Sequence, residues 1–130
     1  MTSRIHYTTI DAGDPLAVAT FWQHVLGGTL DLDDDPDEGQ EGYEVALDLA
    51  DRSLLFIRVP EAKTVKNRMH FDVEPTDRTR DEEVERLLGL GATQADDRRR
   101  PDGAGWAVLR DPEGNEFCVV RSAAERPPST

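Results

Sequence analysis

Three side chains that could do chemistry alternate along one short stretch of the chain: His70, Asp72 and Glu74. Alternate side chains of a β-strand point to the same side, so these three would face one way while Phe71 and Val73 face the other. Histidine is the side chain that titrates nearest neutral pH, and a carboxylate can accept a hydrogen bond or a proton. The stretch predicts either a ligand-contacting or acid–base site, with His70 and Asp72 as the catalytic candidates, or a hydrogen-bonded network that only supports the fold.

The elements that would position these residues occur twice. Apolar periodicity predicts a helix that Asp14 caps and Gly27 ends, and a second helix that Asp77 caps and Gly91 ends. The two capping Asp residues are 63 positions apart. One strand candidate precedes each helix and three follow it, so the order βαβββ occurs twice, as expected for a duplicated unit. The strands are expected at residues 5–10, 29–32, 43–49 and 53–59, and again at 69–74, 93–95, 106–110 and 116–121.

Two segments carry a family resemblance: Asp111–Val120 (DPEGNEFCVV), a turn that runs into an apolar strand, and Lys66–Val73 (KNRMHFDV). With them, the chain from Ile5 to Arg121 resembles the vicinal oxygen chelate superfamily, in its glyoxalase-like, bleomycin-resistance and dioxygenase branch. The resemblance implies an α+β fold in which two βαβββ modules form a curved, mostly antiparallel sheet around a cleft. A single domain would span residues 1–122, with the modules at about 4–60 and 67–122.

The resemblance also implies four positions for metal ligands, because each module supplies one ligand from its first strand and one from its last. In the second module these positions hold His70, which matches the family, and Cys118, where the family usually has Glu. In the first module they hold Tyr7 and either Phe56 or Ile57. One match of four predicts no divalent metal, and nothing in the chain calls for another cofactor.

An alternative metal set starts from a histidine next to one of these positions. A bulge in the first strand could turn His6 inward, and His6, His70 and Cys118 would then form a plausible zinc set. Against this, a slip of one residue sends a side chain to the opposite face of the sheet. Cys118 is more simply explained as a small apolar strand residue.

The expected ligand site is the cleft, with polar strand positions of both modules on its walls. Tyr7 and Thr9 would line the wall opposite His70, and Trp106 would either stack on a flat ligand or pack in the core. The predicted ligand-binding residues are Tyr7, Thr9, His70, Asp72, Glu74, Trp106 and Cys118.

Composition excludes several classes of partner. The 27 acidic residues outnumber the 15 basic ones and give a formal net charge of −12, which argues against a nucleic acid or an anionic membrane surface. The single cysteine permits no internal disulfide, and the N-terminus lacks a signal-peptide apolar region, so we expect a cytoplasmic protein. The acidic stretch 33–42 is expected to be a loop, and residues 123–130 a disordered tail.

Two functions of different class are compatible with these features. The first is the metal-independent binding of a small organic molecule between the two modules, similar to the bleomycin-binding members of the family. The second is a lyase or isomerase of the glyoxalase type, which would use either the displaced metal set or metal-free acid–base chemistry at His70 and Asp72. The resemblance further implies a homodimer.

Overall fold

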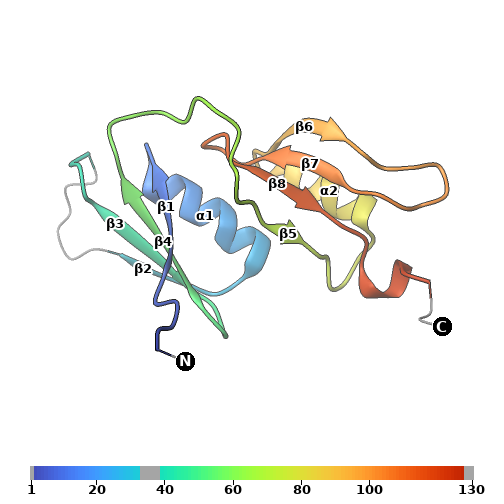
Figure 1. The fold of residues 1–130 in the computed structure, drawn as a ribbon, viewed down its shortest axis with the longest axis horizontal. Helices are drawn as coiled ribbons and strands as arrows, with labels where there is room; N and C mark the ends of the chain where they lie inside the picture. Colours follow the sequence, from blue (N-terminus) through green and yellow to red (C-terminus); the bar gives the residue numbers. More distant parts are fainter. Residues whose placement is uncertain (1, 33–38, 128–130) are drawn as a thin grey trace. The chain divides into compact units, whose positions relative to one another are not determined.

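A computed structural model describes residues 2–32 and 39–127. The chain divides into two compact units, Met1–Thr64 and Val65–Thr130, and each unit contains one βαβββ module (Figure 1). The predicted α+β fold is thus confirmed, and each module forms a four-stranded sheet of its own. Residues 33–38 of the predicted acidic loop lie outside the part of the chain that the structure describes.

Unit 1 is a four-stranded sheet with one helix. Its strands lie in the order β1-β4-β3-β2; β1 runs parallel to β4 and the other pairs are antiparallel. The elements, in chain order, are β1 (Thr8–Ala12), α1 (Pro15–Leu26), β2 (Thr29–Leu32), β3 (Glu44–Asp48) and β4 (Ser53–Arg58).

Helix α1 begins and ends at the predicted residues. The side chain of Asp14 accepts a hydrogen bond from the Ala17 N–H at 3.1 Å, and Pro15 occupies the first turn, where no N–H is needed. Gly27 ends the helix with a positive φ of 76°, a conformation that favours glycine. The helix packs on one face of the sheet, and together they bury the core of the unit: Val18, Ala19, Phe21, Trp22, Val45, Leu47, Leu54 and Phe56.

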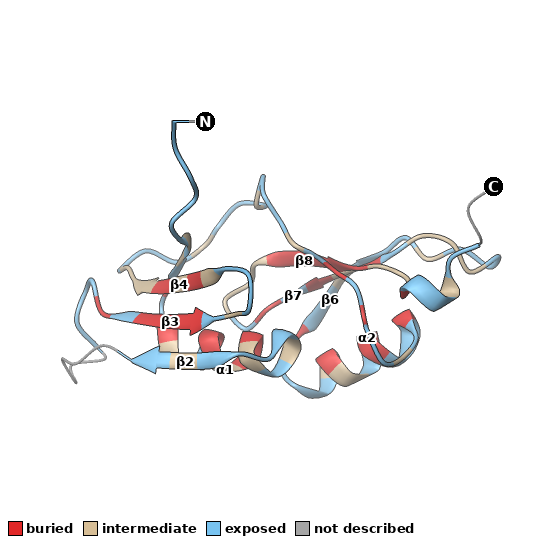
Figure 2. Cartoon of the chain, turned by 90° about the horizontal axis from the view of Figure 1, so that it is seen from below, coloured by how far each residue is buried: buried red, intermediate tan, exposed pale blue. Residues whose placement is uncertain are grey.

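Unit 2 repeats this topology. Its strands lie in the order β5-β8-β7-β6, again with the first strand parallel to the last. The elements are β5 (Asp72–Val73), α2 (Arg80–Gly89), β6 (Thr93–Asp97), β7 (Ala107–Arg110) and β8 (Glu116–Val119). The buried core side chains are Val73, Val84, Leu87, Ala107, Leu109, Phe117 and Val119 (red in Figure 2).

The start of α2 corrects one prediction. Thr79, not Asp77, is the N-cap: its hydroxyl accepts from the Glu82 N–H, and the Glu82 carboxylate accepts from the Thr79 N–H at 2.9 Å. This reciprocal arrangement satisfies two free N–H groups at the start of the helix. Asp77 instead pairs with its neighbour Arg78 at 2.9 Å.

The first strand of each module also differs from its predicted range. Strand β1 spans Thr8–Ala12 rather than residues 5–10, because only these residues are paired with β4. Strand β5 is two residues long, although the Cys118 N–H also donates to the Phe71 carbonyl at 2.9 Å. His70 therefore lies just before β5 rather than inside a six-residue strand.

The C-terminal segment 123–130 was predicted to be a disordered tail, and in the structure part of it forms a helical turn that contacts α2. Ala123–Glu125 form the short 3-10 helix η1, and the Glu125 carboxylate accepts from the Arg80 and Ser122 N–H groups, both at 2.8 Å. This carboxylate thus satisfies an N–H at the start of α2, which the sequence pattern did not reveal. Residues 128–130 lie outside the described range. No helix in the described chain is long and apolar enough to span a membrane.

Candidate functional site

The turn before β8 is built around the buried carboxylate of Asp111. One of its oxygens accepts from the Glu113 and Asn115 N–H groups at 2.9 Å, and the other accepts from the Asn115 side-chain amide at 3.1 Å. Gly114 has a φ of 87°, so the turn uses a conformation that other residues rarely adopt. These bonds fix where β8 begins, and with it the position of Cys118.

Asn67 joins this turn to the segment that leads into β5. Its backbone N–H donates to the buried carboxylate of Glu116 at 3.0 Å, and its side-chain amide donates to the Asn115 side chain at 3.0 Å. The segment that carries His70 is thereby tied to β8 three residues before His70. The two sequence segments that carry the family resemblance are thus in direct contact.

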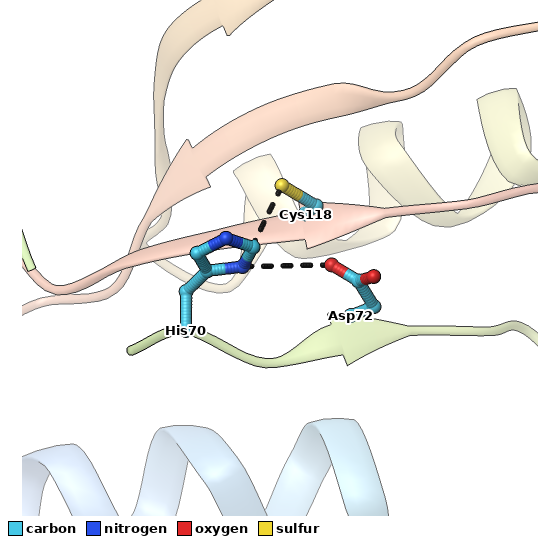
Figure 3. A group of neighbouring side chains, drawn as sticks. All are labelled: His70, Asp72 and Cys118. Carbon is cyan, nitrogen blue, oxygen red and sulfur yellow. Dashed lines mark hydrogen bonds and ion pairs between the residues drawn. The ribbon is translucent and has the colours of Figure 1, made fainter. Parts of the chain in front are cut away.

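Strand register then brings three potential ligand atoms together on one face of the sheet. Asp72 is the register partner of Cys118, and His70 lies two residues before Asp72. The His70 Nδ1 is 3.5 Å from the Asp72 Oδ1 and 4.0 Å from the Cys118 Sγ (Figure 3). One donor atom from each of the three residues lies within 4.8 Å of the other two, and no other such group of His, Cys, Asp and Glu occurs among the described residues. We call these three residues the trio.

The trio has one buried and two exposed members. Cys118 is 8% exposed, whereas the side chains of His70 and Asp72 are 38% and 62% exposed. Burial, and then the neighbouring Asp72 carboxylate, raise the pKa of the Cys118 thiol. A free nucleophilic cysteine needs the opposite shift. In a Cys–His–Asp relay, moreover, thiol and carboxylate would contact opposite ring nitrogens, whereas here both approach Nδ1 (Figure 3).

The trio instead fits a divalent cation. Sulfur, imidazole nitrogen and carboxylate oxygen are all zinc ligands, and bonds of about 2.0–2.3 Å in a tetrahedron place neighbouring ligand atoms roughly 3.3–3.6 Å apart. The separations at Nδ1 are 3.5 and 4.0 Å, close to these values, and all three donor atoms lie within 4.8 Å of one another, so the side chains would draw closer around a bound cation. The predicted zinc set named His6 as its third member, but the third donor that the structure brings to His70 and Cys118 is Asp72.

Two further predicted site residues of unit 2, Trp106 and Glu74, are not members of the trio. Trp106 directly precedes β7 and is 39% exposed; Val108, two residues on, is the register partner of Cys118, so alternation places Trp106 on the face of the trio. Glu74 was expected to act with His70 and Asp72. Its carboxylate pairs with Arg126 at 3.1 Å, and it is not a member of the trio.

The predicted site residues of unit 1 lie at its first strand. Thr9 is an exposed residue of β1 whose register partner is Leu55, and Tyr7 precedes the strand with its ring 4.4 Å from that of His6. Phe56 is fully buried on the helix side, so it cannot be a ligand position, while Leu55 faces the other way.

Sequence reasoning missed the metal-binding potential of Asp72 and the positioning role of Asn67. The spacing of His70 and Asp72 was visible, but Asp72 was considered only as an acid–base or ligand-contacting group. Asn67 lies in a segment that carries the family resemblance, but its positioning role was not visible, because its partners are 48 and 49 residues away in the sequence.

Comparisons with known proteins agree with this fold. Two solved structures similar to the chain are the fosfomycin resistance protein FosX from Mesorhizobium loti (16% identity, 92% of each chain covered, TM-score 0.69) and a glyoxalase/bleomycin resistance protein/dioxygenase family enzyme from Burkholderia phytofirmans (22% identity, 90% of this chain and 97% of the other, TM-score 0.63). A third is a mutant of FosX from Listeria monocytogenes complexed with Mn(II) and a dihydroxypropylphosphonic acid (16% identity, 92% of this chain and 93% of the other, TM-score 0.70).

At these sequence identities, the similarity to the solved structures shows the fold alone. No curated protein sequence matches the chain. The family model of the glyoxalase-like domain, however, matches residues 7–120, which is most of the sequence. The chain therefore belongs to the glyoxalase-like domain family.

Proposed function

We propose that this protein binds a small organic molecule on the face of the β5-β8-β7-β6 sheet that carries the trio. The observation that carries the proposal is the gathering of His70, Asp72 and Cys118 on the face opposite the apolar core, with Trp106 on the same face. Small-molecule sites combine apolar and aromatic surface with a few convergent polar groups, and this face offers both.

Each residue has a distinct part in this proposal. The exposed ring of His70 and the exposed carboxylate of Asp72 hydrogen-bond the polar atoms of the ligand, and Trp106 stacks on a flat or apolar portion. The carboxylate and the net charge of −12 favour a neutral or cationic molecule over an anion, as long as no cation is bound at the trio.

A second candidate function, a lyase or isomerase of the glyoxalase type, is favoured by one specific observation: the donor atoms of the trio fit a divalent cation. A bound cation would supply Lewis-acid polarisation of a substrate oxygen. The trio would hold it, and Trp106 would orient the substrate. Without a cation, His70 would accept a substrate proton through its ring nitrogen while Asp72 holds the ring.

The proposed binding is tested with whatever small molecule co-purifies, identified by native mass spectrometry of untagged protein. His70→Ala should weaken its binding by about 1–3 kcal/mol, the cost of a lost buried hydrogen bond. His24→Ala, a histidine of helix α1, is the matched control and should leave the affinity unchanged. Unchanged affinity in His70→Ala, measured beside its melting temperature, would remove His70 from the site and make it a supporting residue.

A further inference from the structure

We propose that His70, Asp72 and Cys118 form a thiolate-containing site that selects a thiophilic divalent cation of the zinc class. One donor atom from each of the three residues lies within 4.8 Å of the other two. The Asp72 carboxylate and the Cys118 sulfur approach the same ring nitrogen of His70, at 3.5 and 4.0 Å. Atoms that surround one point are arranged for a shared cation, whereas a proton relay would place them on opposite sides of the ring.

The backbone imposes this arrangement. Asp72 and Cys118 are register partners on adjacent parallel strands, so their side chains leave the sheet side by side. The Asp111 turn fixes the start of β8, and Asn67 ties the segment before His70 to that turn. Exposed acidic side chains often lie close together without binding an ion. This site differs, because strand pairing places the buried thiol of Cys118 beside the carboxylate of Asp72.

The chemistry of the donor atoms selects the class of cation. A thiolate, an imidazole and a carboxylate favour zinc and similar thiophilic cations, whereas magnesium, calcium and manganese prefer oxygen ligands. The sequence predicted no metal because Cys118 stands where the family usually has a glutamate ligand and was counted there as a mismatch. Three protein donors also leave one tetrahedral position for water or for an oxygen of the ligand, and the exposure of His70 and Asp72 leaves that side accessible.

Cobalt(II) titration of chelator-treated, reduced full-length protein tests this inference. A thiolate ligand gives a sulfur-to-cobalt charge-transfer band in the near ultraviolet. Cys118 is the only cysteine in the chain, so such a band would show that Cys118 is a ligand of the cobalt ion. We expect the band to saturate at one cobalt per chain, to disappear on addition of one equivalent of zinc, and to persist in excess magnesium.

Substitutions separate the trio from adventitious binding. Cys118→Ser should abolish the band. His70→Gln and Asp72→Asn, at exposed positions where folding is little affected, should each lower cobalt affinity by at least about 10- to 100-fold, the loss that even indirect supporting residues cause. The matched controls are His24→Gln and Glu74→Gln, which replace the same side-chain types outside the trio and should leave affinity unchanged.

Two results would overturn the inference. One is cobalt binding without a charge-transfer band. The other is a band that His70→Gln and Asp72→Asn leave at wild-type affinity. The test uses the metal alone, so its failure is distinct from a failure of the proposed small-molecule binding, which is measured with the co-purified molecule.

Discussion

The two units share one topology but differ in the chemistry of the sheet face away from the helix. At the offset of 63 residues that relates Asp14 to Asp77, His70 and Asp72 correspond to Tyr7 and Thr9 (70 − 63 = 7 and 72 − 63 = 9). The β4 partner of Thr9 is Leu55, and the β8 partner of Asp72 is Cys118. A phenol, a hydroxyl and an isobutyl group in unit 1 thus stand where unit 2 has an imidazole, a carboxylate and a thiol.

This difference shows which parts of a repeated module can change independently. On the helix face, both units keep large, fully buried apolar side chains, such as Phe56 and Phe117, because the helix must pack against the sheet. The opposite face carries no such constraint, so its residues can serve chemistry. The proposed metal site therefore belongs to unit 2, and we expect unit 1 to act as a scaffold with a weakly polar face.

The largest predicted effects come from the part that the units share. Phe56→Ala and Phe117→Ala each remove a ring from a closed core, so each should lower the free energy of unfolding by about 3–5 kcal/mol. Urea unfolding followed by circular dichroism measures both. A near-zero cost for either residue would show that its unit lacks the tight core described here.

The next prediction removes the difference between the units. Replacing the trio by its unit 1 counterparts, His70→Tyr, Asp72→Thr and Cys118→Leu, should abolish cobalt binding. The larger side chain at the buried Cys118 should cost about 1–3 kcal/mol of stability through overpacking. Isothermal titration with cobalt and a urea melt measure the two effects. Undiminished cobalt binding would mean that the metal binds elsewhere, and that the difference between the two units at these positions does not concern metal binding.

A smaller effect is expected at the residue that positions the trio. Asn67→Ala removes the side-chain hydrogen bond to Asn115, at a cost of about 0.5–1.5 kcal/mol, and loosens the segment that carries His70. Cobalt affinity should fall by roughly tenfold while the charge-transfer band is retained, because all three ligands remain. Wild-type affinity in this variant would mean that Asn67 supports the fold alone.

The helix caps give a matched pair across the units. Asp14→Ala and Thr79→Ala should each lower the free energy of unfolding by about 0.5–2 kcal/mol. Each removes a side chain that accepts a hydrogen bond from a backbone N–H at the start of its helix. Asp77→Ala should change stability very little. Urea melts of the three variants measure these costs, and a larger loss at Asp77 than at Thr79 would restore Asp77 as the cap.

The smallest predicted effect is a pH dependence at Asp97 of unit 2. The hydrogen bond from Arg99 lowers the pKa of Asp97 to about 2. A carboxylate with a depressed folded pKa stabilises the protein above its unfolded pKa, near 3.8, and this contribution is lost as the pH falls toward about 2. Asp97→Asn should therefore flatten the loss of stability across this range, which acid-dependent urea melts measure. An unchanged slope would show that the pair contributes nothing.

Sequence alone was sufficient for the order and type of the elements, because these follow from local signals. The caps at Asp14 and Gly27 and the turn at Asp111 depend on residues close together in the chain, and they were predicted correctly. The Thr79–Glu82 capping box was equally local but was overlooked in favour of the Asp14–Asp77 repeat. The homodimer and the cytoplasmic location remain predictions.

The candidate site was harder to predict because it depends on register between strands far apart in the sequence. His70 and Asp72 were identified from alternation, but that Cys118 pairs with Asp72 depends on the parallel pairing of β5 and β8. Glu74 followed the same alternation yet pairs with Arg126, since β5 ends at Val73. Alternation therefore held for His70, two residues before Asp72, but it did not bring Glu74, one residue beyond β5, into the trio.

X-ray absorption spectroscopy at the zinc edge tests the central claim most directly. For protein loaded with one zinc per chain, we predict a first shell with one sulfur at about 2.3 Å and nitrogen or oxygen ligands at about 2.0–2.2 Å, including an imidazole. With a single cysteine in the chain, that sulfur is Cys118. A first shell of oxygen and nitrogen alone would contradict the claim, because it would exclude Cys118 as a ligand.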